Sequence, residues 1–163
     1  MHQPITIRQL PAQAITPENF RPYGQVIFAA PDGKGFDQED AQLYLSEGTP
    51  RFYIMRLHYR GRSFSRITRH QRCTQCLGAL AGQEWLIAVA PPGEADCPDP
   101  VTIAAFRIPG NCFIKLEVGT WHAGPLFEQE SVDFYNLELA DTNITDHQTC
   151  SLSETYGLEF EIV

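Results

Sequence analysis

The chain has 163 residues, of which 43% are hydrophobic and 20% are charged, and its formal net charge is -8 at pH 7. This composition is typical of a globular protein, and the length predicts a single domain over residues 1–163 that buries its own core. The sequence has no apolar run of the ~20 residues that cross a bilayer, and its negative charge disfavours nucleic acid as a partner.

The N-terminal segment and the cysteines both favour a cytoplasmic protein. Residues 1–10 have polar residues at alternating positions and lack the apolar core of a signal peptide. The chain has 5 cysteines, an odd number that favours free thiols over a disulfide framework. Cys73 and Cys76 form a C-x-x-C pair. A redox site would need a strand-to-helix context and a structural zinc site a second pair, so we favour neither.

A short helix is predicted near the N-terminus. Thr16 can cap this helix, Pro17 suits its first position, and Glu18 suits the positive end of its dipole. Pro22 and Gly24 should end it soon afterwards, because both residues disfavour a continuing helix.

From residue 25 onward the sequence predicts a mainly β protein, because short segments rich in Val, Ile, Phe and Tyr lie between Gly and Pro residues. Residues 51–59 alternate between two sets of side chains, as expected for a strand with two different faces. Residues 90–100 are too rich in proline for a strand and predict a loop, and residues 142–154 are interpreted as a polar tail. Strands are expected around residues 26–28, 51–59, 63–70, 75–80, 84–90, 101–108, 113–118 and 132–139.

Arginines are concentrated between Arg51 and Arg72. Two interpretations remain open for this cluster. Solvated strand faces and loop ends are favoured, and a basic mouth for a small anionic molecule is the alternative.

Two short motifs have the spacing found in cupin barrels. His70, Gln75 and Gly82 resemble the first cupin motif, and Gly119 and His122 resemble the second. The resemblance implies an all-β, cupin-type barrel (a double-stranded β-helix), preceded here by the short N-terminal helix.

The cupin resemblance also implies a metal site, with two departures from the usual ligands. The usual first histidine would stand at Thr68, and Gln75 replaces a glutamate. A divalent ion such as nickel, manganese or zinc would then be held by His70, Gln75 and His122, a weaker set than three imidazoles and a carboxylate.

A second set of residues, spread over most of the chain, matches a more specific pattern: Phe20, Tyr23, Gly24, Val26-Ile27, Arg69-His70, Thr74-Gln75, Gly119-Thr120-Trp121-His122, Pro125-Leu126-Phe127 and Asp133-Phe134. On these residues the chain resembles, more closely, the ureidoglycolate lyase family, formerly called ureidoglycolate hydrolases. The resemblance implies cleavage of ureidoglycolate to glyoxylate and urea, without water, in allantoin and purine catabolism.

The chain departs from the family pattern where chemistry is expected, as a divergent member would. The family has a glutamate at Thr68, a His-Arg pair at Glu117-Val118, and a second histidine at Ala123. These departures keep open an alternative function, a non-catalytic or divergent cupin that binds a small organic acid.

The reaction needs a base for the substrate hydroxyl and an acid for the departing urea nitrogen. The resemblance and the spacing suggest His122 or Glu117 as the base, and His70 as the acid or as a metal ligand. The substrate is a small organic anion, and Arg69 and Lys115 are the candidates to bind its carboxylate.

The roles of Lys115, Glu117 and Glu138 depend on which way two strand faces point. Lys115 and Glu117 share one face of the strand predicted at 113–118, and this face points either to solvent or into a cavity. Glu138 is in the same position on the last predicted strand, and Trp121 is expected in the core or the cavity wall. Small barrels leave exposed sheet edges, so a homodimer is expected.

Overall fold

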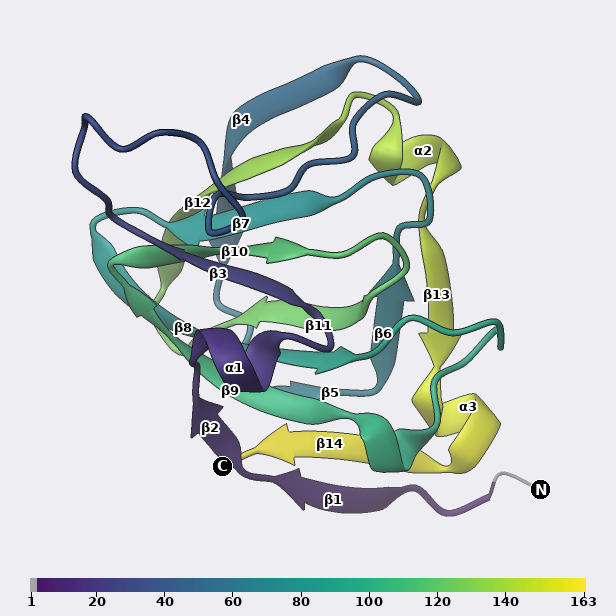
Figure 1. The fold of residues 1–163 in the computed structure, drawn as a ribbon. Coiled ribbons are helices and arrows are strands. Elements are labelled where there is room, and N and C mark those ends of the chain that lie inside the picture. Colours follow the sequence, from purple (N-terminus) through teal and green to yellow (C-terminus); the bar gives the residue numbers. More distant parts are fainter. Residues whose placement is uncertain (1–2) are drawn as a thin grey trace.

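Two antiparallel sheets face each other and enclose the main hydrophobic core in the computed structural model, which describes residues 3–163 (Figure 1). The first sheet has the strand order β3–β10–β7–β12–β4. Its strands are β3 (Gly24–Phe28), β4 (Pro50–His58), β7 (Gln75–Ala79), β10 (Cys112–Leu116) and β12 (Ser131–Leu139).

The second sheet has the order β13–β6–β11–β8–β9–β2, in which only the β2–β9 pair is parallel. Its strands are β2 (Ala12–Ala14), β6 (Arg66–Arg69), β8 (Gly82–Ala90), β9 (Ala104–Gly110), β11 (Trp121–Leu126) and β13 (Gln148–Ser151). A third, smaller sheet joins β1 (Thr6–Leu10), β14 (Leu158–Ile162) and β5 (Ser63–Phe64).

The strand order is that of a jelly roll. The central strands form two four-stranded arrays, β4–β12–β7–β10 and β6–β11–β8–β9, and the chain passes repeatedly from one array to the other. Eight strands in two such sheets are the architecture of cupin barrels. The expected cupin-type, mainly β fold is therefore confirmed.

Strand alternation separates an interior and an exterior face in both sheets. Leu77 and Ile114 are register partners and lie in the core between the sheets. Their chain neighbours Cys76 and Lys115 are also partners and must point to the outer face. A second core, between the six-stranded sheet and the third sheet, contains Trp121 and Phe160.

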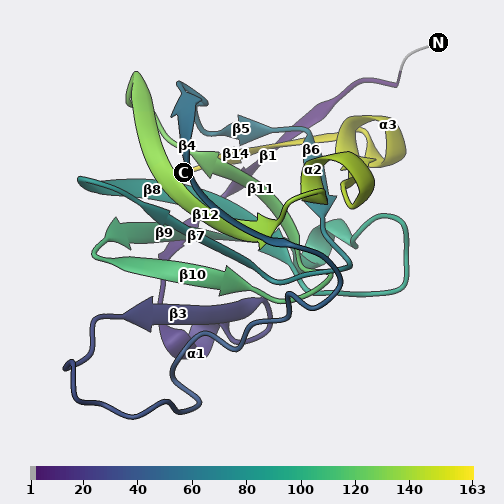
Figure 2. The ribbon, with the colours of Figure 1, turned by 90° about the horizontal axis from the view of Figure 1, so that it is seen from above.

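The predicted N-terminal helix is confirmed as α1 (Pro17–Phe20). The Thr16 side chain accepts a hydrogen bond from the Asn19 amide, and the Asn19 side chain accepts one from the Thr16 amide. This reciprocal pair is a capping box. Figure 2 shows α1 against β3, away from the two C-terminal helices.

Most predicted strands are confirmed, but two expectations were wrong. Residues 142–154 are no tail: they form α2 (Thr142–Thr145), β13 and the start of α3 (Leu152–Tyr156). Cys150 and Leu152 anchor this segment because both are buried in the second core. The strand expected from residue 101 begins at Ala104, because a short 3-10 helix (Pro100–Thr102) precedes it.

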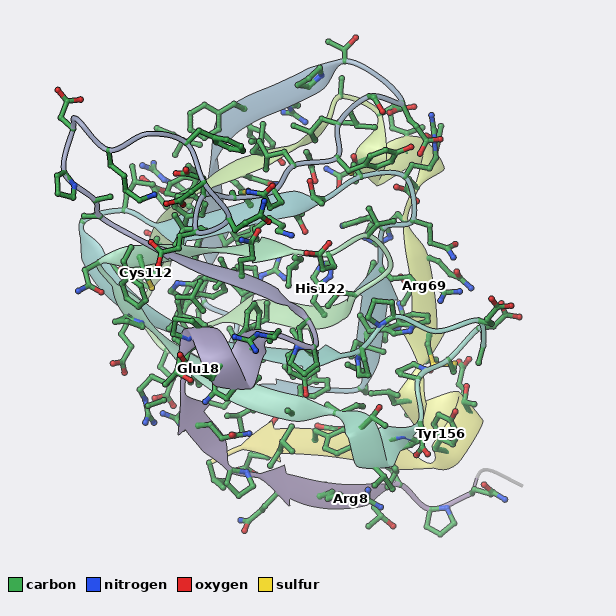
Figure 3. All side chains as sticks on the ribbon, in the orientation of Figure 1. Arg8, Glu18, Arg69, Cys112, His122 and Tyr156 are labelled. Atoms are coloured by element: carbon green, nitrogen blue, oxygen red, sulfur yellow. A yellow bond between two sulfur atoms is a disulfide. The ribbon has the colours of Figure 1, made fainter. Side chains whose placement is uncertain are left out.

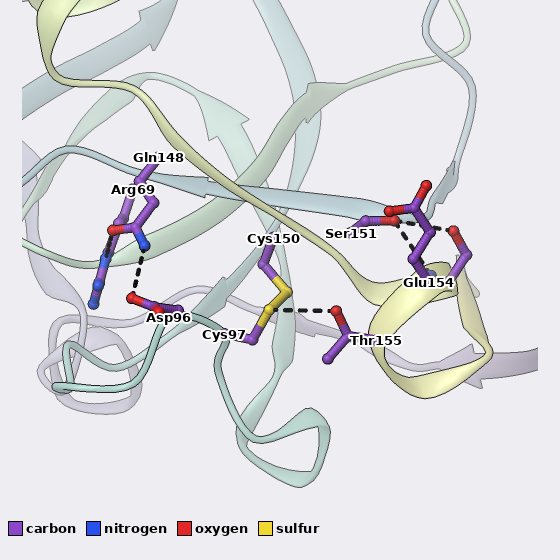
Figure 4. Close-up of a disulfide and its surroundings, with 9 residues drawn as sticks. Arg69, Asp96, Cys97, Gln148, Cys150, Ser151, Glu154 and Thr155 are labelled. Carbon is purple, nitrogen blue, oxygen red and sulfur yellow. Dashed lines mark hydrogen bonds between the residues drawn. A yellow bond between two sulfur atoms is a disulfide. The ribbon is translucent and has the colours of Figure 1, made fainter.

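The prediction of free thiols was wrong for two of the five cysteines. Cys97, in the proline-rich loop, forms a disulfide with Cys150 of β13 (Figure 4). Beside it, Gln148 donates a hydrogen bond to the Asp96 carboxylate at 3.2 Å. Cys73, Cys76 and Cys112 are free and buried. The loop is therefore attached to an edge strand by both covalent and polar contacts.

No helix within residues 3–163 has the length and apolar character that a membrane span requires.

Reduction of the Cys97–Cys150 disulfide is expected to lower the free energy of unfolding by about 2–4 kcal/mol, because the bond closes a loop between residues 53 positions apart. Urea denaturation with and without dithiothreitol measures the change. The Cys97→Ser/Cys150→Ser double variant is the control and should not respond to the reductant. An equal response of both proteins would contradict the prediction.

Candidate functional site

His70 and His122 meet inside the barrel although 52 positions separate them in the sequence shown. In the antiparallel β6–β11 pair, His122 is the register partner of Thr68, and His70 follows Thr68 by two residues. The other partner of His122 is Val89, a residue of the core between the sheets. The two imidazole centroids lie 5.1 Å apart. Strand pairing thus brings together two of the predicted site residues.

His70 is held in one tautomer by the main chain. Its Nδ1 lies 2.6 Å from the carbonyl oxygen of Asp146. A carbonyl can only accept, so Nδ1 carries the proton and Nε2 of the neutral ring has a free lone pair. Burial lowers the pKa of His70, which is 6% exposed, so the ring is neutral near pH 7.

His122 is also a neutral imidazole. Burial, and secondarily the neighbouring His70, lower its pKa to about 3. Its Nδ1 is buried and forms no hydrogen bond. A ring with such a low pKa is a weak base and a poor source of an imidazolium proton. His122 is therefore better suited to form a hydrogen bond with a ligand than to transfer a proton.

A buried polar network lies on the interior face of the first sheet. The Gln75 amide nitrogen donates to Asn136 and to Glu138, both at 3.1 Å. Tyr53 donates to the other Glu138 oxygen at 3.3 Å and accepts from Asn136 at 3.1 Å. Gln75 therefore commits its donors to this network, while its own carbonyl oxygen is buried without a partner. Glu138 is 1% exposed. Its strand face therefore points into the barrel and not to solvent, which is one of the two directions that the sequence left open.

A hollow of about 500 Å³ opens beside His122, toward the side of β6 and β13. Arg60 and Arg66 line it, and among residues 3–163 neither guanidinium forms an ion pair. Thr68 and His147 line the same hollow. A narrower gap between His70, Gln75 and His122 has no room for a water molecule. Of these two spaces, the wider hollow can take a small organic anion without rearrangement and the narrow gap cannot.

Arg69 and Trp121 lie on the opposite face of the sheet from His122. Arg69 is 3% exposed, and it donates to the Gln148 side chain at 2.9 Å and to the Gly93 carbonyl at 2.6 Å. Its guanidinium stacks over the Trp121 ring at 4.4 Å. Figure 3 shows Arg69 beside β13 and His122 nearer the middle of the molecule. The structure thus does not bring these two predicted residues to the histidines.

Lys115 is also separated from the two histidines, and it engages Glu117. Lys115 lies on the outer face of β10, and its ammonium is paired with the Glu117 carboxylate. Its register partner on β3, Gln25, donates to main-chain carbonyls of Gln38 and Asp40, so the segment between β3 and β4 covers this face. Glu117 borders the narrow gap, but its carboxylate is engaged by Lys115.

The donor set does not fit a firmly held transition metal. His70 and His122 offer two imidazoles, and among residues 3–163 the only buried side-chain oxygen without a hydrogen-bond partner is the neutral Gln75 amide oxygen. Within the described part of the chain, no group of three or more His, Cys, Asp or Glu side chains could hold a metal ion. Divalent ions prefer more, or charged, ligands in proteins. We therefore derive no chemical step through a metal.

Sequence reasoning missed two residues near the histidines and left the role of a third open. Arg66 is part of the arginine cluster, for which a basic mouth was the alternative interpretation, and positions 66, 68 and 70 share one face of a strand. His147 and Asp146 could not be found, because only the pairing of the following edge strand β13 with β6 brings them there. The ring of His147 is exposed and its centroid lies 5.7 Å from that of His70.

Folding should become less favourable in acid because of His122. Its pKa is about 3 in the folded protein and near 6.5 in the unfolded chain, so the unfolded chain binds more protons below pH 6.5. Between pH 7 and pH 5 the free energy of unfolding should fall by on the order of 2 kcal/mol more than in His122→Gln. Urea denaturation of both proteins at several pH values tests this. Parallel pH profiles would show that His122 is not buried in the neutral form.

Comparisons of the sequence and of the structure relate the chain to known proteins. A sequence model of the ureidoglycolate lyase family matches residues 37–159, which include every residue of the candidate site. No curated protein matches the chain significantly. A crystal structure of a dTDP sugar isomerase from Desulfovibrio desulfuricans G20 is 11% identical, with a TM-score of 0.42 over 72% of this chain and 75% of that one. On the family match, the chain belongs to the ureidoglycolate lyase family.

Proposed function

We propose that the protein is a ureidoglycolate lyase, which cleaves ureidoglycolate to glyoxylate and urea in allantoin and purine catabolism. The observation that carries the proposal is the neutral, buried pair of His70 and His122, of which His122 lines a hollow with the arginines Arg60 and Arg66. Membership of the lyase family supports an enzyme of this kind. The substrate is a small carboxylate, and the hollow is large enough to hold it.

Arg60 and Arg66 are proposed to bind the substrate carboxylate. Both are exposed in the hollow, and a guanidinium can bind a carboxylate through two parallel hydrogen bonds. Arg69 and Lys115 are engaged elsewhere, so they are not available for this role. The carboxylate would thus be held at the open side, with the rest of the substrate facing His122.

His70 is proposed to move the proton. The substrate hydroxyl would reach His70 from the hollow once the narrow gap between His70 and His122 widens. The Nε2 lone pair of His70 would then accept the hydroxyl proton, and the O–H electrons would form the C=O bond of glyoxylate. The C–N bond breaks as its electrons go to the urea nitrogen, which receives the proton back from His70. His122 stays neutral and offers a hydrogen bond to the same substrate. No water is consumed, and hydrogen is conserved between substrate and products.

The test is the release of glyoxylate and urea from racemic ureidoglycolate by purified protein. Turnover is expected before and after chelation, and added nickel, manganese or zinc should not raise it, because the donor set lacks a charged ligand. His70→Ala should lower kcat by roughly 100-fold or more, since general acid–base groups contribute about that factor. No turnover by folded wild-type protein under any of these conditions would contradict the lyase assignment.

Arg60→Ala and Arg66→Ala should each raise KM by roughly tenfold to a hundredfold, the value of a charge-assisted hydrogen bond. Arg56→Ala is the matched control, because Arg56 lies on a strand of the opposite sheet and pairs with Asp133 at 2.8 Å. Steady-state kinetics of the three variants measures the effect. An unchanged KM in both Arg60→Ala and Arg66→Ala would show that neither arginine binds the substrate carboxylate.

A second candidate function is binding without catalysis. Thr68, Glu117 and Ala123 occupy positions where the family has a glutamate, a histidine and a histidine, and the hollow would still attract a small organic acid. Binding of such acids by calorimetry, in protein that shows no turnover, would favour this function.

We also propose that the protein forms a homodimer through the exposed edge of β4. This strand ends the first sheet, and its outward side chains Phe52 and Ile54 are 71% and 62% exposed. Covering an exposed strand edge is a common reason for self-association. A monomer in sedimentation equilibrium would contradict this proposal.

A further inference from the structure

The turn between β6 and β7 carries His70, and one residue fixes it from outside the strand. The Asp146 carboxylate accepts hydrogen bonds from the main-chain amides of Gln71 and Arg72, both at 2.8 Å. The main-chain carbonyl of the same residue accepts from Nδ1 of His70 at 2.6 Å. Asp146 thus contacts the backbone of the turn and the imidazole that the turn presents.

We propose that Asp146 is the positioning residue of the site, which sets both the place and the tautomer of His70. The proposal rests on the function proposed above, in which the Nε2 lone pair of His70 moves the proton. Asp146 is 9% exposed, and each of its carboxylate oxygens accepts from one turn amide. The contacts are therefore short, charge-assisted and shielded from water, which makes them stronger than exposed ones.

A second contact holds the turn on its other side. The His70 carbonyl accepts from the amide of Gly119, at 2.7 Å, in the segment that leads into β11 and His122. Gly119 has φ +83, a left-handed conformation that suits glycine. The turn is consequently fixed to the His122 side by Gly119 and to the β13 side by Asp146. Removal of the Asp146 carboxylate frees one of these two sides.

Asp141 offers a matched comparison at the other end of α2. Its carboxylate also reaches this turn, but through the Arg72 side chain at 3.4 Å, and that ion pair is exposed. Asp141 contacts neither the turn amides nor His70. If a negative charge near the turn were enough, the two aspartates would be equivalent. If the main-chain contacts matter, only Asp146 will affect His70.

Loss of the carboxylate should change the chemistry more than substrate binding. When the turn and the Asp146 main chain move apart, Nδ1 of His70 loses its acceptor, and the proton can move to Nε2. A ring with the proton on Nε2 cannot accept the hydroxyl proton there. A displacement of about 1 Å can cost roughly 100-fold in rate, so kcat should fall by about that factor while KM changes by less than about threefold.

The experiment compares wild type, Asp146→Ala, Asp146→Asn and Asp141→Ala. Long-range ¹H–¹⁵N spectra of the imidazoles report the His70 tautomer, with His70→Gln to assign its signals, and steady-state kinetics report kcat and KM. Wild type and Asp141→Ala should show the proton on Nδ1 and equal kcat. Asp146→Ala should show mixed tautomers and the loss in kcat. Asp146→Asn keeps one acceptor oxygen, so its tautomer mixture and its kcat should lie between those of wild type and those of Asp146→Ala.

Each outcome bears on the proposal. The wild-type tautomer in both Asp146 variants would overturn it, whatever their turnover. If Asp146→Ala does not fold, the tautomer of Asp146→Asn decides alone, and an unperturbed His70 would again overturn the proposal. If wild type has no lyase activity, the proposed function fails, but the spectra still test whether Asp146 sets the state of His70.

Discussion

The alternation of side chains along paired strands decides which residues of this protein can act together. The register of β6 on β11 places Thr68 opposite His122, and the period of two then brings His70 to the same face. The same period turns Arg69 and Trp121 to the other face, where they stack on each other. A shift of one residue in this pairing would exchange the two sets and remove the histidines from the barrel.

Burial then determines the chemical state of the residues that face inward. Both histidines are neutral because desolvation disfavours their charged forms. Neutral imidazoles can accept or donate a hydrogen bond without a counter-ion, which suits an elimination near pH 7. Glu138 is buried as well, and it is stabilised by Gln75 and Tyr53 rather than by a cation. Arg60 and Arg66 supply the positive charge of the site, and both are exposed to water in the hollow.

The sequence allowed the fold and part of the site to be predicted. The spacings of His70 to Gln75 and of Gly119 to His122 resemble the two cupin motifs, and that resemblance implied the barrel. The presence of glycine at position 119 has a physical reason, because the backbone there has a positive φ that favours glycine. The outward direction of Arg69 follows from its position next to His70 in a strand, but the motif led us to group the two residues.

Contacts between distant segments could not be predicted in this way. The polar composition of residues 142–154 conceals a strand that pairs with β6 and is anchored by Cys150. The disulfide to Cys97 depends on that pairing, and so does the position of Asp146 against the turn at His70. The burial of Lys115 could not be predicted either, because a polar residue on a strand gives no sign that a loop will cover it. Only the folded chain shows which polar residues are enclosed.

A crystal structure with N-carbamoylglycine would test the central claim most directly. This compound is ureidoglycolate, the proposed substrate, without its hydroxyl, so it can bind but cannot undergo the proposed elimination. The account predicts its carboxylate against Arg60 or Arg66 and its ureido group beside His70 and His122, on the interior face of β6 and β11. Density for the compound at Arg69 and Trp121, or at Lys115 and Glu117, would contradict the account and move the site to the outer face of a sheet.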